Sequence, residues 1–108
     1  MDPDELPWPA WDLLDPMAYA QNELYMGPGV GRSMPMLATR GCPYECTFCS
    51  SANMWTQVWK ARKPAKVADE IEFYMKHYGA NDFQFQDLTA IVRKDWIVQF
   101  CQELIQRK

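Results

Sequence analysis

Residues 39–49 read Thr39-Arg40-Gly41-Cys42-Pro43-Tyr44-Glu45-Cys46-Thr47-Phe48-Cys49, and this stretch decides most of what the chain can be. Three of the four cysteines stand here in the spacing C-x3-C-x2-C. Thiolates this close together favour one soft metal centre, because cysteine sulfur suits iron–sulfur clusters, zinc and copper(I). A four-iron cluster normally takes four thiolates. Three local ligands therefore predict a cluster with one open iron, which can bind a substrate or cofactor.

Two other interpretations of these cysteines stay open. In the first, His77 or Cys101 supplies a fourth ligand and closes a structural zinc site, although zinc fingers usually place their ligands in two separated pairs. We instead expect Cys101 to be a buried thiol on an apolar helix face and His77 to be a partly exposed residue at a helix end. In the second, Cys46-Thr47-Phe48-Cys49 is a redox pair, which leaves Cys42 without a role.

Strands and helices are predicted on both sides of the cysteine run. The apolar run 34–39 leads into Gly41 and predicts a buried strand, and the alternation over 82–86 predicts another. Pro64 suits the first turn of a helix that Gly79 ends. A last helix is predicted from Lys94. The core-facing residues expected are Val67, Ile71, Met75 and Tyr78 on the first of these helices, and Ile97, Phe100, Cys101 and Leu104 on the second.

This order of elements predicts an α/β fold with parallel strands joined by helices. Six of the eight prolines lie in the first 35 residues, and a Gly-Pro-Gly run stands there too, so we expect an irregular linker over residues 1–33. Its apolar residues, Trp8, Trp11, Leu13 and Leu14, are expected to pack against the rest of the chain. The remainder, 34–108, has room for two βα units of about 30 residues each.

The cysteine run resembles the signature of the radical S-adenosylmethionine superfamily, which is C-x3-C-x2-C with an aromatic residue before the last cysteine. Phe48 stands at that place. The lead Arg40-Gly41-Cys42-Pro43-Tyr44 and the Pro-rich stretch 6–14 are most similar to the branch whose members carry an N-terminal cobalamin-binding domain. The resemblance implies a partial (βα)6 TIM-like barrel. Residues 34–108 would be the N-terminal portion of that domain, and we interpret the chain as a truncated form.

The resemblance also implies the cofactors and their ligands. Cys42, Cys46 and Cys49 would each hold one iron of a [4Fe-4S] cluster, and S-adenosylmethionine would chelate the fourth iron. Phe48 would lie beside the adenine, or else pack into the barrel mouth. Asp87, and next Gln86, would bind the methionine amino group, although Leu88 stands where a second carboxylate is common; the alternative for Asp87 is a turn or helix-capping residue. Cobalamin would be held by a domain outside this chain.

The expected function is an iron–sulfur-binding segment of an enzyme that cleaves S-adenosylmethionine reductively to start radical chemistry. The alternative is a non-catalytic zinc module or an inactive fragment, since 108 residues are few for such an activity. The implied partners are a small-molecule substrate and an electron donor such as flavodoxin or ferredoxin.

The charge and hydropathy of the chain indicate which classes of partner it does not bind. The net charge of −3 argues against a nucleic-acid surface, and the local basic cluster, Lys60, Arg62, Lys63 and Lys66, is expected to be solvated. No apolar run approaches the roughly 20 residues of a membrane helix. We therefore expect no nucleic-acid partner, no membrane partner and a cytoplasmic location. In that reducing compartment, cysteines more often serve as metal ligands than form disulfides.

Overall fold

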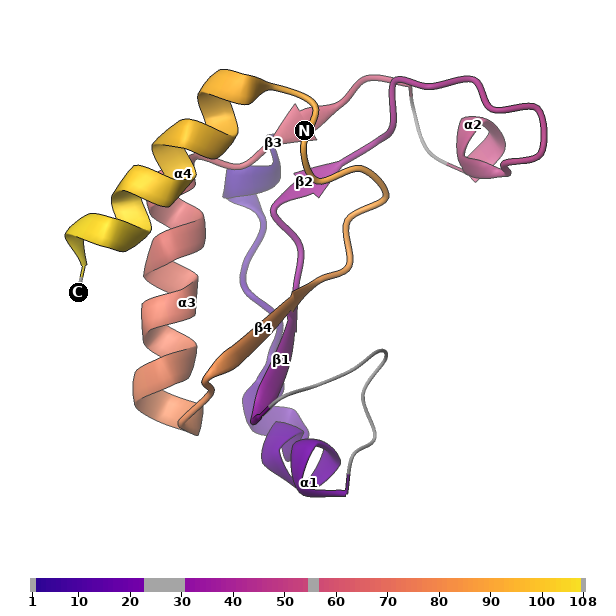
Figure 1. Cartoon of the computed structure of the whole chain (residues 1–108). Helices are drawn as coiled ribbons and strands as arrows, with labels where there is room; N and C mark the ends of the chain where they lie inside the picture. Colours follow the sequence, from indigo (N-terminus) through magenta and orange to yellow (C-terminus); the bar gives the residue numbers. More distant parts are fainter. Residues whose placement is uncertain (1, 23–30, 55–56, 108) are drawn as a thin grey trace.

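The computed structural model describes residues 2–22, 31–54 and 57–107, and it has the predicted α/β architecture. Strands β1 (Ser33–Met36) and β4 (Asp82–Phe85) lie side by side and run parallel. Helices α3 (Pro64–Tyr78) and α4 (Lys94–Gln106) pack together on one side of this pair (Figure 1). The shorter elements are two 3-10 helices, Pro3–Glu5 and Trp11–Leu13, and α1 (Pro16–Gln21), β2 (Thr39–Arg40), α2 (Ser51–Met54) and β3 (Lys60–Ala61).

The strand predicted over 34–39 is two strands. β1 pairs with β4 from Ser33 opposite Asp82 to Met36 opposite Phe85, and the parallel order predicted from the sequence is confirmed. After β1 the chain changes partner, and β2 pairs antiparallel with β3. The sequence did not reveal this change of partner, because residues 34–39 form one continuous apolar run. Such a run does not show which strand each part of it pairs with.

The hydrophobic core lies between the strand pair and the two helices. Met34 and Met36 of β1 point into it, whereas the alternate residues Pro35 and Leu37 are exposed, as the period of a strand requires. Burying one large apolar side chain stabilises the fold by about 1.5–3 kcal/mol. The buried core residues are Met34, Met36, Ala38, Val67, Ile71, Tyr74, Ala80, Trp96 and Phe100.

Helix α3 begins and ends where the sequence predicts. Pro64 occupies its first turn, and Gly79 ends it with a positive φ of 63°, a conformation in which glycine has no Cβ to clash. The predicted core face is wrong at Met75, which is 52% exposed, while Tyr74 is buried in its place. Tyr74 is drawn inward because its hydroxyl donates to Glu70 at 2.5 Å and accepts the indole proton of Trp11 at 3.0 Å.

Helix α4 buries Trp96 and Phe100 and leaves Cys101 exposed, so the predicted burial of Cys101 is wrong. The indole of Trp96 donates to the backbone carbonyl of Arg62 at 2.7 Å and stacks on Phe100. These contacts turn the helix so that Cys101 and Leu104 leave the core. None of the helices in the described part of the chain combines the length and the apolar character needed to cross a membrane.

The N-terminal segment packs along the body of the fold. Trp8 lies 5.2 Å from Phe73 between ring centroids, and Trp11 contacts the core, as predicted. Leu13 and Leu14 are exposed, contrary to the prediction. The description of residues 1–33 as irregular is wrong at α1, which Asp15 caps by accepting two backbone N–H groups. The Gly-Pro-Gly run falls outside the described residues.

Arg62 belongs to the basic cluster that was predicted to be solvated, and for this residue the prediction is wrong. The Arg62 side chain is only 13% exposed, and its guanidinium pairs with Glu70 at 2.5 Å and lies 3.8 Å from Asp4. It also donates to the Leu37 carbonyl at 3.0 Å. Arg62 therefore joins the N-terminal segment, α3 and the end of β1 through one buried group of charges.

Candidate metal centre

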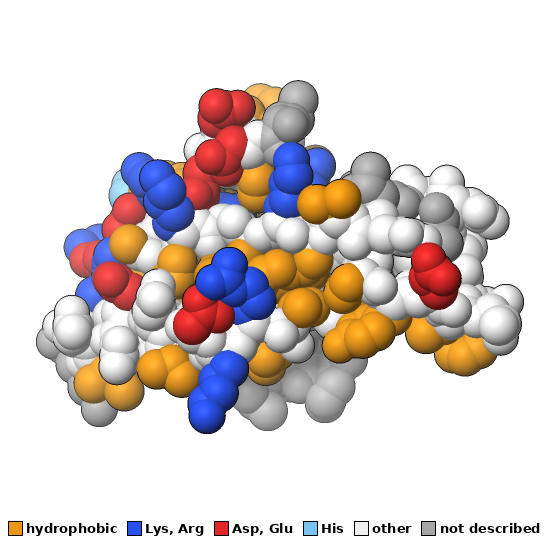
Figure 2. All heavy atoms as spheres, turned by 90° about the horizontal axis from the view of Figure 1, so that it is seen from above, with side chains coloured by type: hydrophobic (Ala, Val, Ile, Leu, Met, Phe, Trp, Pro, Cys, Tyr) orange, Lys and Arg blue, Asp and Glu red, His pale blue; other side chains and the backbone are white. Residues whose placement is uncertain are grey.

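The cysteine loop leaves β2 at the carboxyl end of the parallel strands. Gly41 is buried and has a φ of 82°, so a residue without Cβ makes the turn directly before Cys42. The loop and α2 then project away from the two helices (Figure 1). Figure 2 shows that the projecting part carries uncharged and hydrophobic side chains, with little of the charge that covers the helical end. A metal held here would sit where parallel α/β folds place their reactive groups.

The three thiols are presented differently. Cys42 is half-buried at the base of the loop, whereas Cys46 and Cys49 are exposed and joined by a backbone turn, N–H of Cys49 to carbonyl of Cys46, at 3.0 Å. Within the described ranges, no three His, Cys, Asp or Glu side chains are gathered closely enough to hold a metal ion. The donor set itself fits a soft centre, because it consists of three thiols within eight residues on one exposed loop.

Cys49 has a local hydrogen-bonding partner in Ser51. The two side chains lie 2.9 Å apart, and the Ser51 N–H points to the same sulfur at 3.5 Å. The Ser51 hydroxyl first, and then its N–H, lower the pKa of the Cys49 thiol below its usual value. The thiolate is the form that ligates metals, so this contact favours the ligating state of Cys49.

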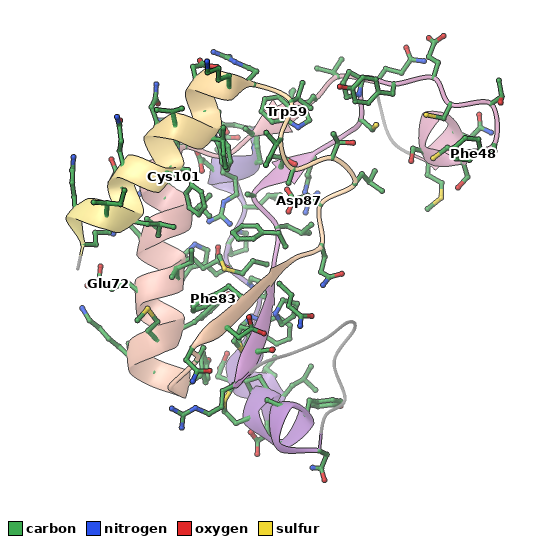
Figure 3. The ribbon with its side chains drawn as sticks, viewed as in Figure 1. Phe48, Trp59, Glu72, Phe83, Asp87 and Cys101 are labelled. Atoms are coloured by element: carbon green, nitrogen blue, oxygen red, sulfur yellow. The ribbon has the colours of Figure 1, made fainter. Side chains whose placement is uncertain are left out.

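Asp87 ties the loop after β4 to the end of β1 (Figure 3). Its carboxylate accepts the backbone N–H groups of Ala38 and Thr39, with 3.1 Å from Ala38 to Oδ1. The Thr39 hydroxyl donates to the same oxygen at 2.5 Å. The other oxygen, Oδ2, receives the same Ala38 N–H at 3.2 Å, as its single contact among the described residues. Asp87 thus fixes the backbone that leads into the cysteine loop and retains one oxygen with accepting capacity.

Thr89 also contacts the cysteine loop. Its hydroxyl donates to the sulfur of Cys42 at 3.1 Å, and its backbone carbonyl accepts the indole proton of Trp59 at 2.9 Å. Neither Thr39 nor Thr89 was predicted as a site residue. A usable signal was their position, since each is a polar residue within four positions of the end of β1 or β4, where the carboxyl ends of the parallel strands meet.

The two other predicted cofactor residues lie apart from this network. The Phe48 side chain is 92% exposed on the projecting loop, well away from Asp87 (Figure 3). Gln86 follows β4, where its backbone N–H donates to Met36 at 2.9 Å, and it lines a cavity of about 320 Å³ shared with the N-terminal segment. The structure brings neither to the cysteines.

The candidates for a fourth protein ligand also lie elsewhere. Cys101 is on α4, on the opposite side of the molecule from Phe48 (Figure 3). His77 is exposed in the last turn of α3, as predicted, and its ring stacks on Phe73 at 3.8 Å. Its Nδ1 lies 3.0 Å from the Phe73 carbonyl. Neither side chain supports a zinc site closed around the cysteine loop.

Two known proteins are similar to this chain over most of its length. The anaerobic magnesium-protoporphyrin IX monomethyl ester cyclase of Cereibacter sphaeroides is 33% identical over 99 residues, which are 92% of this chain and 15% of that protein. The cytidylyl-2-hydroxyethylphosphonate methyltransferase of Streptomyces wedmorensis is 35% identical over 86 residues, 78% of this chain and 16% of that protein. The chain belongs to the radical S-adenosylmethionine superfamily. The membership of this superfamily that the cysteine run predicts is thus confirmed.

A third relative carries a methyltransferase name as well. The bacteriochlorophyllide d C-12(1)-methyltransferase of Chlorobaculum tepidum is 31% identical over 71 residues, 64% of this chain and 16% of that protein. The chain thus spans about a sixth of the length of the relatives it matches. It matches no family model and no solved structure. The similarity to radical S-adenosylmethionine proteins therefore rests on the matched segments of these relatives and on the cysteine run.

Proposed function

We propose that this chain is the iron–sulfur-binding segment of a radical S-adenosylmethionine enzyme. Cys42, Cys46 and Cys49 would hold three irons of a [4Fe-4S] cluster and leave the fourth for S-adenosylmethionine. The observation that carries the proposal is the position of the C-x3-C-x2-C loop at the carboxyl end of the β1–β4 parallel pair. The homologous cyclases and methyltransferases support it.

We also propose that β1 and β4 are the first two strands of a partial (βα)6 barrel. Their parallel pairing supports this, as does the position of α3 and α4 on one side of them (Figure 1). In such a barrel the other face of the strands, which here exposes Pro35 and Leu37, would turn inward. Residues 1–33 would then be the segment that precedes the barrel.

The chain's own residues would prepare the site in distinct ways. Cys42 is half-buried at the base of the loop, while Cys46 and Cys49 present exposed thiols on the projecting part. Oδ2 of Asp87 has accepting capacity for an amino group, and Phe48, exposed on the loop, offers an aromatic face to an adenine. Gln86 is the second candidate for the amino group. When bound, the cluster would supply the electron that cleaves S-adenosylmethionine.

The remaining cofactors and partners follow from the same proposal. An external reductant of the flavodoxin or ferredoxin type would deliver the electron, and cobalamin would be bound by another domain. The relatives are named as both cyclases and methyltransferases. We therefore propose the shared initiating step and a small-molecule substrate of unspecified class, in a cytoplasmic protein.

Anaerobic reconstitution with iron and sulfide tests the ligand set. We expect the wild-type chain to retain about four irons and four sulfides. Cys46→Ala should retain none, whereas Cys101→Ala, the matched control on α4, should retain the wild-type amount. Uptake of one zinc without sulfide would favour the structural module, and loss of the cluster in Cys101→Ala without unfolding would contradict the three-ligand assignment.

A further inference from the structure

We infer that Thr89 is a positioning residue for the metal centre. Its hydroxyl holds the sulfur of Cys42 in the position from which this sulfur would bind the metal. The inference rests on the proposed function and adds a residue that neither the motif nor the relatives' names point to. Its basis is the 3.1 Å contact from Thr89 Oγ1 to Cys42 Sγ, which crosses from the loop after β4 to the loop after β2.

Cys42 differs from the other two ligands in how firmly the fold holds it. It is half-buried, and the buried Gly41 before it takes the positive φ that aims the chain into the loop. Cys46 and Cys49 are exposed, and Cys49 contacts Cys46 and Ser51, which are close to it in sequence. Of the three ligands, Cys42 is therefore the one whose position is determined by the rest of the fold before a metal binds.

Thr89 can hold this sulfur because its own backbone is fixed. Its carbonyl accepts the Trp59 indole proton at 2.9 Å. Two residues earlier, Asp87 is bound to the backbone of Ala38 and Thr39. The Thr39 hydroxyl lies 3.3 Å from the Thr89 carbonyl as well as 2.5 Å from Asp87. The hydroxyl of Thr89 thus completes a continuous set of contacts from the end of β1 to the first ligand.

A hydrogen bond to a ligating sulfur has two consequences. It orients the ligand, and residues that orient metal ligands typically change metal affinity by about 10- to 100-fold when they are replaced. It also withdraws charge from the sulfur and so favours the reduced, more negative cluster, because hydrogen bonds to cluster sulfurs are among the factors that set the reduction potential. A purely structural threonine would produce neither effect.

The experiment compares Thr89→Val, which keeps the shape and loses the hydroxyl, with Thr89→Ser, which keeps the hydroxyl. Thr47→Val is the matched control, since Thr47 is exposed within the same cysteine loop. In the reconstituted chain, we expect Thr89→Val to lose its cluster to an iron chelator about 10-fold faster than wild type. Its reduction potential should shift to more negative values. Thr89→Ser and Thr47→Val should behave as wild type in both measurements.

A double-mutant cycle on the metal-free chain tests the contact itself. Urea unfolding of Thr89→Val, Cys42→Ala and the double variant should show non-additive effects, with a coupling of about 2- to 10-fold in the unfolding equilibrium constant. If Thr89→Val does not fold, Thr89→Ala replaces it in both experiments.

The outcomes separate the two proposals. A wild-type chain that holds a cluster, with Thr89→Val unchanged in chelator half-life and potential, contradicts the role of Thr89 and leaves the proposed function standing. A wild-type chain that holds no cluster contradicts the proposed function, and the positioning role with it. Altered half-life and potential in Thr89→Val with rescue in Thr89→Ser supports the inference.

Discussion

The hydroxyl of Thr39 donates to the carboxylate of Asp87 across 2.5 Å, and this contact joins the end of β1 to the loop after β4. The backbone N–H groups of Ala38 and Thr39 donate to the same carboxylate. Neighbouring parallel strands bring these residues together although they lie 48 positions apart in the sequence. The carboxylate of Asp87 thus holds the backbone that leads into the cysteine loop.

Replacing Asp87 with alanine should destabilise the chain by about 2–4 kcal/mol, because it leaves part-buried donors at Ala38 and Thr39 without their acceptor. Urea unfolding followed by circular dichroism measures the change. Asp12→Ala, on an exposed residue of the N-terminal segment, is the control and should stay within about 0.5 kcal/mol of wild type. Equal stability of the two variants would show that Asp87 does not hold the strand ends.

Replacing Glu70 with alanine should cost about 3 kcal/mol, because the buried guanidinium of Arg62 loses its close partner. The double variant Arg62→Met/Glu70→Leu should recover much of this loss, since no uncompensated charge remains. Chemical denaturation of the three proteins checks the expectation. A Glu70→Ala variant as stable as Glu72→Ala, whose carboxylate is surface-exposed and pairs with Lys76, would contradict it.

Stability should fall at high pH through Tyr74. Burial, and then the hydrogen bond and charge of Glu70, raise the pKa of this phenol above its usual value of 10. The unfolded chain therefore loses this proton near pH 10 while the folded chain keeps it. The contribution is complete below that pH and declines above it by at most about 1.4 kcal/mol per pH unit.

Denaturation midpoints between pH 8 and 11 for wild type and Tyr74→Phe measure this contribution. Phenylalanine has no proton to lose, so the difference in stability between the two proteins should shrink as the pH rises above 10. A difference that stays constant over that range would show that Tyr74 does not titrate differently in the folded chain.

The sequence allowed the α/β class, the parallel strands and the limits of α3 to be predicted, because these depend on local signals. Pro64 and Gly79 mark the helix ends by their backbone chemistry alone. The faces of the helices were predicted less well. Tyr74 replaced Met75 in the core, and Trp96 displaced Cys101. Each buried ring makes a hydrogen bond to a residue distant in sequence, Tyr74 with the indole of Trp11 and Trp96 with the carbonyl of Arg62.

The residues of the candidate site were also predicted only in part. The cysteine run was evident from its spacing, but the residues that support it were not. Asp87 was singled out for a cofactor, and the structure shows a contact that was not predicted, from Ala38 and Thr39 to its carboxylate. Thr89 was missed because its contact with Cys42 depends on the pairing of β1 with β4. Neighbours across a parallel sheet cannot be identified from a single sequence.

The most direct test of the central claim is the electron paramagnetic resonance spectrum of the reduced, reconstituted chain, recorded with and without S-adenosylmethionine. If Cys42, Cys46 and Cys49 hold a cluster with one open iron, the cofactor will bind that iron and change the spectrum. The same change should be absent in a cluster-free Cys42→Ala sample. A four-iron spectrum that S-adenosylmethionine leaves unaltered would contradict the assignment of an open iron.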